Sequence, residues 1–161
     1  YDMEMGEQLY AAASHNEDSL LLDYVNKLRL NNFEMDSSYF NTGILLMNLK
    51  AIRPYVKRKD ILDFIEKNRN RLMLPDQDVL NGLYADRVMA IPDEIYNYDA
   101  RYSLIYQAKS QGKWDLNWVI EHTVFLHFAG RDKPWKSNYR GRYSGLYKFI
   151  ARLTRKFEER H

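Results

Sequence analysis

The fold class is decided by the stretch Tyr39-Phe40-Asn41-Thr42-Gly43-Ile44-Leu45-Leu46-Met47-Asn48. Its second half is a nearly unbroken apolar run that has the length of a strand and is too short to span a membrane. An apolar run without polar alternation is typical of a strand covered on both faces, as in a sheet flanked by helices. The stretch therefore predicts an α/β fold with this strand buried inside it.

Shorter patterns on either side predict further strands and helices. Strands are expected over residues 6–14, 88–91 and 123–128, the second at a sheet edge before Pro92 and the third buried. Helices are expected over residues 18–30, 55–68 and 76–84, with Asn16, Pro54 and Asp76 at their starts. Residues 93–113 show no clear period and predict a long tyrosine-rich loop.

The composition is that of a globular chain. Its 161 residues are 45% hydrophobic and 29% charged, which excludes a disordered or fibrous protein. The absence of cysteine excludes disulfides and thiolate metal sites and is compatible with a cytoplasmic setting. The length fits one domain or part of a larger one. Because the sequence starts at Tyr1 rather than Met, we expect further residues upstream.

Charge is distributed unevenly along the chain. Residues 1–130 contain 14 Lys and Arg against 19 Asp and Glu, whereas residues 131–161 contain 10 against 3. At helical spacing, one face carries Tyr143, Leu146, Tyr147, Ile150, Leu153 and Phe157. The opposite face carries Lys148, Arg152, Arg155 and Lys156, and Phe149 falls near this polar side. Such a helix suits an anionic bilayer surface and equally suits docking on a domain. We expect no nucleic-acid partner, because the acidic body would repel the strand.

Two stretches combine polar side chains with a turn or a helix start. The first places Asn41 and Gly43 at the entrance of the buried strand, where an amide can donate and accept and glycine permits close backbone approach. The second places Asp76, Gln77 and Asp78 around one helix start. Such a cluster could orient sugar hydroxyls or stabilise positive charge at an anomeric carbon.

A third stretch, residues 127–135, follows the last predicted strand. His127 offers an imidazole for a metal ion, while the Gly130 backbone and the Lys133 ammonium could bind phosphate oxygens. No histidine pair has HxH or HxxxH spacing, so a closed zinc site is not expected.

Each stretch also has a purely structural interpretation. An Asn at a strand entrance is typical turn chemistry, and acidic residues in a first helical turn favour the helix dipole. A lone histidine is commonly a hydrogen-bonded structural residue. No single stretch distinguishes these alternatives.

Taken in order, the motifs resemble glycosyltransferase family 8, the retaining sugar-nucleotide transferases that include bacterial lipopolysaccharide galactosyl- and glucosyltransferases and the glycogenins. The motifs lie at residues 39–49, 75–81, 92–97 and 127–135. The opening segment, residues 1–6, resembles the one that follows the family's metal-binding Asp-x-Asp. The resemblance implies the C-terminal part of a GT-A-like nucleotide-diphospho-sugar transferase fold, with a mixed sheet flanked by helices and a C-terminal amphipathic helix.

The resemblance also implies residue roles. His127 resembles the histidine that binds Mn²⁺ beside the Asp-x-Asp carboxylates, and Gly130 and Lys133 resemble the loop that holds the nucleotide diphosphate. Asp76 and Gln77 resemble the pair that contacts the donor sugar, with Gln77 near the anomeric centre. The expected roles are catalytic for Gln77, Asp76 and Asp78, cofactor-binding for Lys133, Gly130 and Asn41, and metal-binding for His127.

The implied activity is Mn²⁺- or Mg²⁺-dependent transfer of galactose or glucose from a UDP-sugar to a glycan or glycolipid acceptor. The family's Asp-x-Asp and first strands are missing, so we expect residues 1–135 to be the C-terminal portion of a catalytic domain, inactive alone. Residues 136–161 are expected to form a basic aromatic helix on the inner face of the plasma membrane. A non-catalytic carbohydrate-binding or scaffolding module is the alternative, consistent with an aromatic content of 14%.

Overall fold

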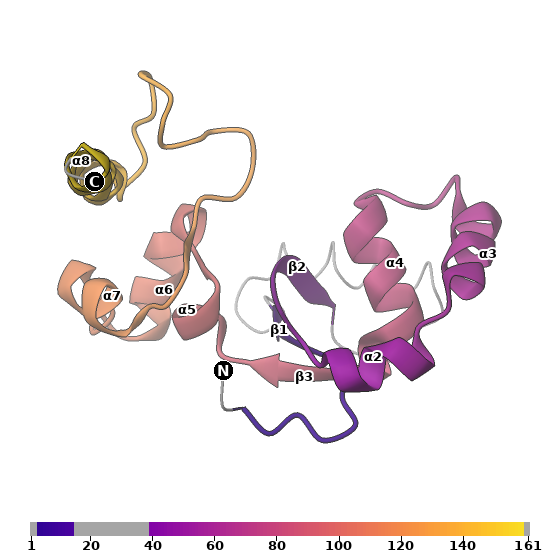
Figure 1. Ribbon diagram of the computed structural model, residues 1–161. Coiled ribbons are helices and arrows are strands. Elements are labelled where there is room, and N and C mark those ends of the chain that lie inside the picture. The colour runs from indigo at the N-terminus through magenta and orange to yellow at the C-terminus, as the bar shows by residue number, and fades with distance from the viewer. Residues whose placement is uncertain (1–2, 15–38, 160–161) are drawn as a thin grey trace. The chain divides into compact units, whose positions relative to one another are not determined.

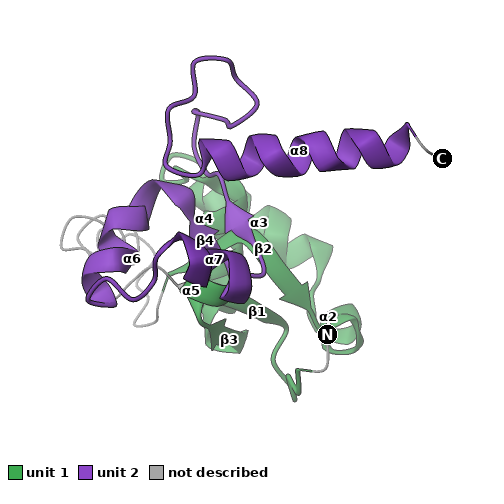
Figure 2. Cartoon of the chain, turned by 90° about the vertical axis from the view of Figure 1, so that its left-hand side faces the viewer, with its two compact units in different colours: residues 1–96 green, residues 97–161 purple. Residues whose placement is uncertain are grey.

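The computed structural model describes residues 3–14 and 39–159 (Figure 1). The chain forms two compact units, residues 1–96 (unit 1) and residues 97–161 (unit 2), which Figure 2 colours separately. The helix expected over residues 18–30, with its cap Asn16, lies outside the described residues. The sequence also predicts a functional boundary between the catalytic portion, residues 1–135, and the C-terminal helix, residues 136–161. This boundary stays a prediction.

Unit 1 is built on a mixed sheet whose strand order is β2-β1-β3. Strand β1 (Tyr10–Ser14) pairs antiparallel with β2 (Phe40–Met47), and Ala12 lies opposite Leu45. The same strand pairs parallel with β3 (Val88–Ile91), so that β3 lies at an edge of the described sheet, as predicted. The mixed sheet inferred from the sequence is therefore confirmed.

The strand buried on both faces is β1 rather than β2. Ala11, Ala12 and Ala13 have no exposed surface, whereas Gly43 and Met47 of β2 are exposed. The prediction of strand β2 was right, but the prediction of its burial was wrong. Burial follows from position in the sheet, and β1 lies between two neighbours while β2 has one in the described part.

The helices of unit 1 begin at positions that differ from the predicted ones. Helix α2 (Leu49–Tyr55) follows β2 directly, because Asn48 Oδ1 accepts a hydrogen bond from Ala51 N at 3.2 Å. Pro54 consequently lies in the last turn of α2 and does not open α3 (Arg58–Asn68). Helix α4 (Pro75–Tyr84) has Leu74 at its N-cap position, so the cap predicted at Asp76 was wrong.

The core of unit 1 lies between the sheet and α4. Helix α4 packs beside β2, and α3 lies outside α4 (Figure 1). A Cβ at Gly82 would lie 2.2 Å from Cζ of Phe64, so α3 approaches α4 closely where α4 has no side chain. The 3₁₀ turn Ala85–Arg87 then leads into β3. The buried core residues are Leu9, Tyr10, Ala12, Phe40, Tyr84, Ala85 and Val88.

Residues 93–113 are not the long loop that the sequence predicted. They contain α5 (Asp93–Tyr96), which ends unit 1, then β4 (Tyr98–Asp99), the 3₁₀ turn Ala100–Tyr102 and α6 (Ser103–Lys109). Each element is too short to show a period in the sequence. Beyond them, α7 (Leu116–His122) precedes β5 (Leu126–His127), which pairs parallel with β4. The third predicted strand is thus present, but it has two residues and is half-buried.

Aromatic packing holds unit 2 together in place of a large sheet. The rings of Tyr98 and Tyr106 stack with centroids 4.2 Å apart, and those of Trp114 and Trp118 stack at 5.0 Å. The Tyr143 hydroxyl donates to the Tyr98 hydroxyl at 2.9 Å, and both side chains are buried. These contacts anchor the start of helix α8 (Ser144–Glu158), which confirms the predicted C-terminal amphipathic helix.

Candidate active site

The N-terminal turn of α4 carries the three polar residues singled out at residues 76–78. Pro75 occupies the first turn of the helix, where its missing N–H costs nothing. Asp76 is exposed and accepts a hydrogen bond from Thr42 Oγ1 at 3.3 Å, while Gln77 is half-buried. These two side chains therefore remain accessible to a ligand.

Asp78 occupies a different environment from Asp76. Its side chain has no exposed surface. Oδ2 accepts hydrogen bonds from the backbone N–H groups of Met73 and Leu74 at 2.6 and 2.8 Å, and Oδ1 accepts one from the Tyr39 hydroxyl. The carboxylate thus satisfies orphan donors at the start of α4 and ties that turn to the residue before β2.

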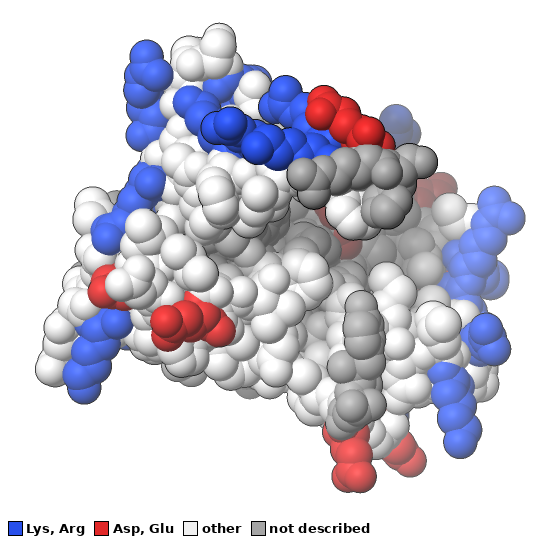
Figure 3. Space-filling model, turned by 60° about the vertical axis from the view of Figure 1, so that its left-hand side comes forward, with Lys and Arg blue, Asp and Glu red and all other residues white. Residues whose placement is uncertain are grey.

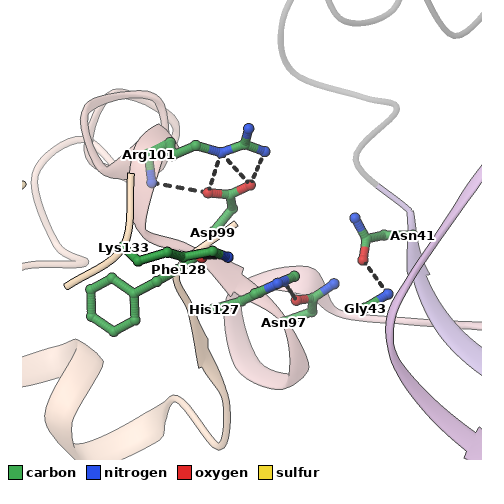
Figure 4. A network of polar contacts seen from close by, with 8 residues as sticks. All are labelled: Asn41, Gly43, Asn97, Asp99, Arg101, His127, Phe128 and Lys133. Atoms are coloured by element: carbon green, nitrogen blue, oxygen red, sulfur yellow. Dashed lines mark hydrogen bonds and ion pairs between the residues drawn. The ribbon is translucent and has the colours of Figure 1, made fainter. Parts of the chain in front are cut away.

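A second buried side chain, Asn81, joins the same two segments. Its Oδ1 accepts a hydrogen bond from Phe40 N at 2.7 Å, and its Nδ2 donates one to Phe40 O at 2.8 Å. The side chain thus makes the pair of backbone bonds that a residue of a neighbouring strand would make. Nδ2 also donates to Gln77 O at 2.8 Å. The structure therefore brings together the motifs at residues 39–49 and 75–81. At the same strand entrance, Asn41 Oδ1 accepts a bond from Gly43 N at 2.7 Å (Figure 4).

In unit 2, the parallel pairing of β4 and β5 positions His127. Its Nδ1 lies 2.8 Å from Oδ1 of Asn97, which is fully buried just before β4 (Figure 4). An amide oxygen only accepts, so Nδ1 carries the proton and the lone pair lies on Nε2. An imidazole oriented in this way has the form in which histidine binds a metal ion.

The segment after β5 forms a cationic loop. Gly130 has φ = +82°, and a Cβ there would lie 3.2 Å from Arg101 Nη1, so both the backbone and the close approach require glycine. Lys133 Nζ donates to Phe128 O at 2.8 Å and lies 5.8 Å from the ring centroid of Trp135. Gly130 and Lys133 line a cavity of about 690 Å³ within unit 2.

The Arg101 guanidinium is fixed beside this loop. It forms a forked interaction with the fully buried Asp99 carboxylate, with Nη2 to Oδ2 at 2.6 Å and Nε to Oδ1 at 3.0 Å (Figure 4). The hydrogen bond to Asp99 raises the pKa of Arg101 above its ordinary value. The Asp99 carboxylate offsets the charge of Arg101 and fixes its guanidinium at the wall of the cavity.

The fit of the site to a metal ion rests on His127. Within residues 3–14 and 39–159, no three His, Asp or Glu side chains gather in a group that could hold a metal ion. His127 fits the role of one ligand, because Asn97 fixes its ring orientation and its tautomer. A complete metal site would need carboxylates from elsewhere.

The predicted site residues thus form two groups. Asn41, Asp76, Gln77 and Asp78 lie in unit 1, and His127, Gly130 and Lys133 lie in unit 2. Sequence reasoning gave no role to Asn81, Asn97 or the Asp99–Arg101 pair. The partners of Asn81 and Asn97 lie 41 and 30 residues away along the chain, so no local pattern indicates them.

Comparison with known proteins places the chain among glycosyltransferases. It is 30% identical over 112 residues to a lipopolysaccharide 1,2-glucosyltransferase of Escherichia coli strain K12, across 66% of this chain and 31% of the relative. It is 29% identical over 103 residues to a lipopolysaccharide 1,3-galactosyltransferase of Salmonella typhimurium, across 63% of this chain and 29% of the relative. The chain therefore spans about a third of the length of these two relatives.

Solved structures bear out the fold class. The crystal structure of the galactosyltransferase LgtC, in complex with donor and acceptor sugar analogs, matches with a TM-score of 0.68 and 24% identity. That match covers 93% of this chain and 53% of LgtC, and it shows the GT-A-like α/β fold inferred from the sequence. The sequence profile of glycosyl transferase family 8 matches residues 1–139. This match covers most of the chain, so the chain belongs to glycosyl transferase family 8.

Proposed function

We propose that this chain is part of a retaining hexosyltransferase that transfers galactose or glucose from a UDP-sugar to a glycan or glycolipid acceptor. The similarity to lipopolysaccharide glucosyl- and galactosyltransferases supports this class of donor and acceptor. The supporting observation within the structure is the Asn97-oriented His127, on the strand that leads into the cationic loop of Gly130 and Lys133. An oriented imidazole and an ammonium group suit a metal-bound diphosphate.

In this proposal, Asp76 and Gln77 contact the donor sugar. Both side chains are accessible at the start of α4, and a carboxylate with an amide can orient hydroxyls and stabilise an oxocarbenium-like sugar. Asp78 is a positioning residue, because its buried carboxylate holds the turn that carries the other two. Asn41 is assigned to the wall of the donor pocket.

We further propose that the acceptor attacks from the front face of the sugar. An amide such as Gln77 is a poor nucleophile, and the buried Asp78 carboxylate accepts three hydrogen bonds from the protein. Trapping a glycosyl adduct on either residue with a slow donor, read by mass spectrometry of the intact chain, would overturn this stereochemical proposal.

The metal requirement is also part of the proposal. His127 would supply one ligand to Mn²⁺ or Mg²⁺, and the ion would stabilise the negative charge of the departing UDP. Carboxylates upstream of residue 1 would supply further ligands. The 161-residue chain alone is accordingly expected not to turn over a sugar nucleotide.

A calorimetric titration of UDP, with and without Mn²⁺, tests the proposal. The titrated proteins are a longer chain that continues upstream of Tyr1 and the 161-residue chain as comparator. Metal-dependent binding by the longer chain that is lost in His127→Ala is the expected result. Binding of sugars without UDP or metal dependence would instead favour a carbohydrate-binding module.

We also propose that helix α8 holds the protein on the inner face of the plasma membrane. Lys and Arg side chains gather along this helix (Figure 3). Its later turns expose Phe149, Ile150, Leu153 and Phe157, each at least 48% accessible. No helix in the described part of the chain has the length and apolar character that crossing a bilayer requires. An exposed apolar stripe with basic neighbours suits attachment to the surface of an anionic bilayer.

A further inference from the structure

The cavity of unit 2 carries more positive charge than the loop of Gly130 and Lys133 supplies. Its lining includes a single acidic residue, Asp132, among the residues that the structure describes. The basic residues that line it are Arg101, Arg131, Lys133, Lys136, Arg140 and Arg142. These side chains come from two separate segments of unit 2, the 3₁₀ turn after β4 and the loop between β5 and α8.

Two of these cations are oriented by neutral groups. Lys136 Nζ donates to the backbone carbonyl of Arg131 at 2.8 Å, and Arg142 Nη1 donates to Oε1 of Gln107 at 2.7 Å. Neutral acceptors fix a cation in place without cancelling its charge. Arg101 differs, because the Asp99 carboxylate neutralises it. The positive charge of Lys136 and Arg142 therefore remains available to a ligand.

This charge exceeds what a nucleotide sugar requires. The diphosphate of a sugar nucleotide carries one negative charge on each phosphate, and Lys133 already offsets part of it. A phosphate monoester carries about −1.5 to −2 at neutral pH and offers three acceptor oxygens, which several Lys and Arg side chains can share. Lys136, Arg140 and Arg142 therefore add three positive charges to the lining of the cavity beyond the charge of Lys133.

We propose that the cavity binds a phosphate group carried by the acceptor, with Lys136, Arg140 and Arg142 as its ligands. The term acceptor rests on the proposed transferase function, whereas the anion site itself does not. At about 690 Å³ the cavity can hold a sugar phosphate. Tyr139 and Asn138 also line it and can hydrogen-bond sugar hydroxyls. Burial raises the pKa of Tyr139 above its ordinary value, so its hydroxyl remains a donor.

The test uses glucose 6-phosphate, glucose and inorganic phosphate as separate probes, titrated calorimetrically into the 161-residue chain. We expect glucose 6-phosphate to bind more tightly than inorganic phosphate, and glucose not to bind. The variant Arg140→Gln/Arg142→Gln should weaken binding of glucose 6-phosphate by about tenfold or more, because two charge-assisted hydrogen bonds are lost. The control Lys57→Gln/Arg58→Gln removes two exposed charges from unit 1 and should leave binding unchanged. If circular dichroism shows that the first variant does not fold, Lys136→Gln takes its place with the same direction of effect.

Three outcomes would overturn the proposal. These are no binding of glucose 6-phosphate, equal weakening in the control, and inorganic phosphate binding as tightly as the sugar phosphate. Displacement of glucose 6-phosphate by UDP in the longer chain would also overturn it, because the site would then belong to the donor. Failure of the longer chain to bind UDP would instead refute the transferase function. It would not contradict the proposed anion site.

Discussion

The imidazole of His127 and the amide of Asn97 are joined at 2.8 Å between Nδ1 and Oδ1, although 30 residues separate them along the chain. Asn97 is fully buried, so its amide cannot turn toward solvent. The bond fixes the tautomer of His127 and the direction of its Nε2 lone pair. Asn97 is therefore a positioning residue for the proposed metal ligand.

Asn97→Ala should release this constraint. We expect the Mn²⁺-dependent affinity for UDP in the longer chain to fall about 10- to 100-fold, as for other residues that orient metal ligands. The ring-nitrogen chemical shifts of His127 should also show loss of the single Nδ1–H tautomer, which a purely structural role would not alter. Asn97→Asp retains an acceptor oxygen and should restore the tautomer. An unchanged tautomer in Asn97→Ala would contradict this role.

Asp78 and Asp76 form a matched pair that tests whether the buried hydrogen bonds stabilise the start of α4. Asp78→Ala removes the acceptor of two backbone N–H groups and of the Tyr39 hydroxyl, and should lower the free energy of unfolding by about 3 kcal/mol. Asp76→Ala removes an exposed carboxylate and should change it by less than about 0.5 kcal/mol. Urea unfolding measures both variants. Equal effects would show that the buried network does not stabilise the start of α4.

Glycines at two helical positions should respond oppositely to alanine. In Gly82→Ala the new Cβ meets the Phe64 ring, which must move, and the expected loss is about 1–3 kcal/mol. In Gly145→Ala, on α8, nothing lies within 4 Å of the new Cβ, so a gain of about 0.4–1 kcal/mol is expected. Thermal unfolding of the two variants compares them directly. A stabilised Gly82→Ala protein would mean that α3 and α4 do not pack as described.

The stability of the protein should fall at alkaline pH. Burial raises the pKa of Tyr98 far above its ordinary value of 10.0. The unfolded chain therefore loses this proton first, so the stabilisation is intact below pH 10 and declines as the pH rises further. The decline reaches at most about 1.4 kcal/mol per pH unit for one group.

Urea unfolding of the wild type and Tyr98→Phe at several pH values from 8 to about 11 measures this decline. The wild type should lose stability more steeply than the variant above pH 10. Burial also raises the pKa of Tyr10, Tyr84 and Tyr139, but those contributions are common to both proteins and cancel in the difference. Parallel curves would rule out the buried Tyr98 hydroxyl as the source.

Helix α8 should bind anionic vesicles. We expect the chain to sediment with vesicles that contain phosphatidylglycerol and not with vesicles of phosphatidylcholine alone. Ile150→Ser/Leu153→Ser removes two exposed apolar groups from the stripe and should abolish most of the binding without affecting the core. The control Leu104→Ser removes an apolar group that is 73% exposed outside α8. Binding independent of anionic lipid would contradict surface attachment by α8.

The sequence predicts those parts of the fold that local patterns specify. The apolar run of β2 predicts a strand and the helical spacing of apolar residues in α8 predicts an amphipathic helix. Both elements are present. Which strand is central cannot be read from β2, because it depends on pairing with β1 and β3. Residues 93–113 depend on contacts such as the Tyr98–Tyr106 stack, which has no periodic signature.

The candidate site shows the same division. Asp76, Gln77, His127 and Lys133 stand out because their residue types suit sugar, metal and phosphate chemistry. The side chains that hold them do not stand out, since the amide of Asn81 acts on Phe40 across 41 residues of sequence. Its neighbours in the sequence place Asp78 with Asp76 and Gln77, and its burial, which appears only in the folded chain, distinguishes its environment from theirs.

The aromatic packing of unit 2 determines what an optical experiment on this chain can detect. All three tryptophans, Trp114, Trp118 and Trp135, lie in that unit. Indole fluorescence will therefore report the unfolding of residues 97–161 and will not report the unfolding of the sheet in unit 1. The signal of unit 1 must come from another probe, such as far-ultraviolet circular dichroism. Coincidence of the two transitions would show that the units unfold as one cooperative block.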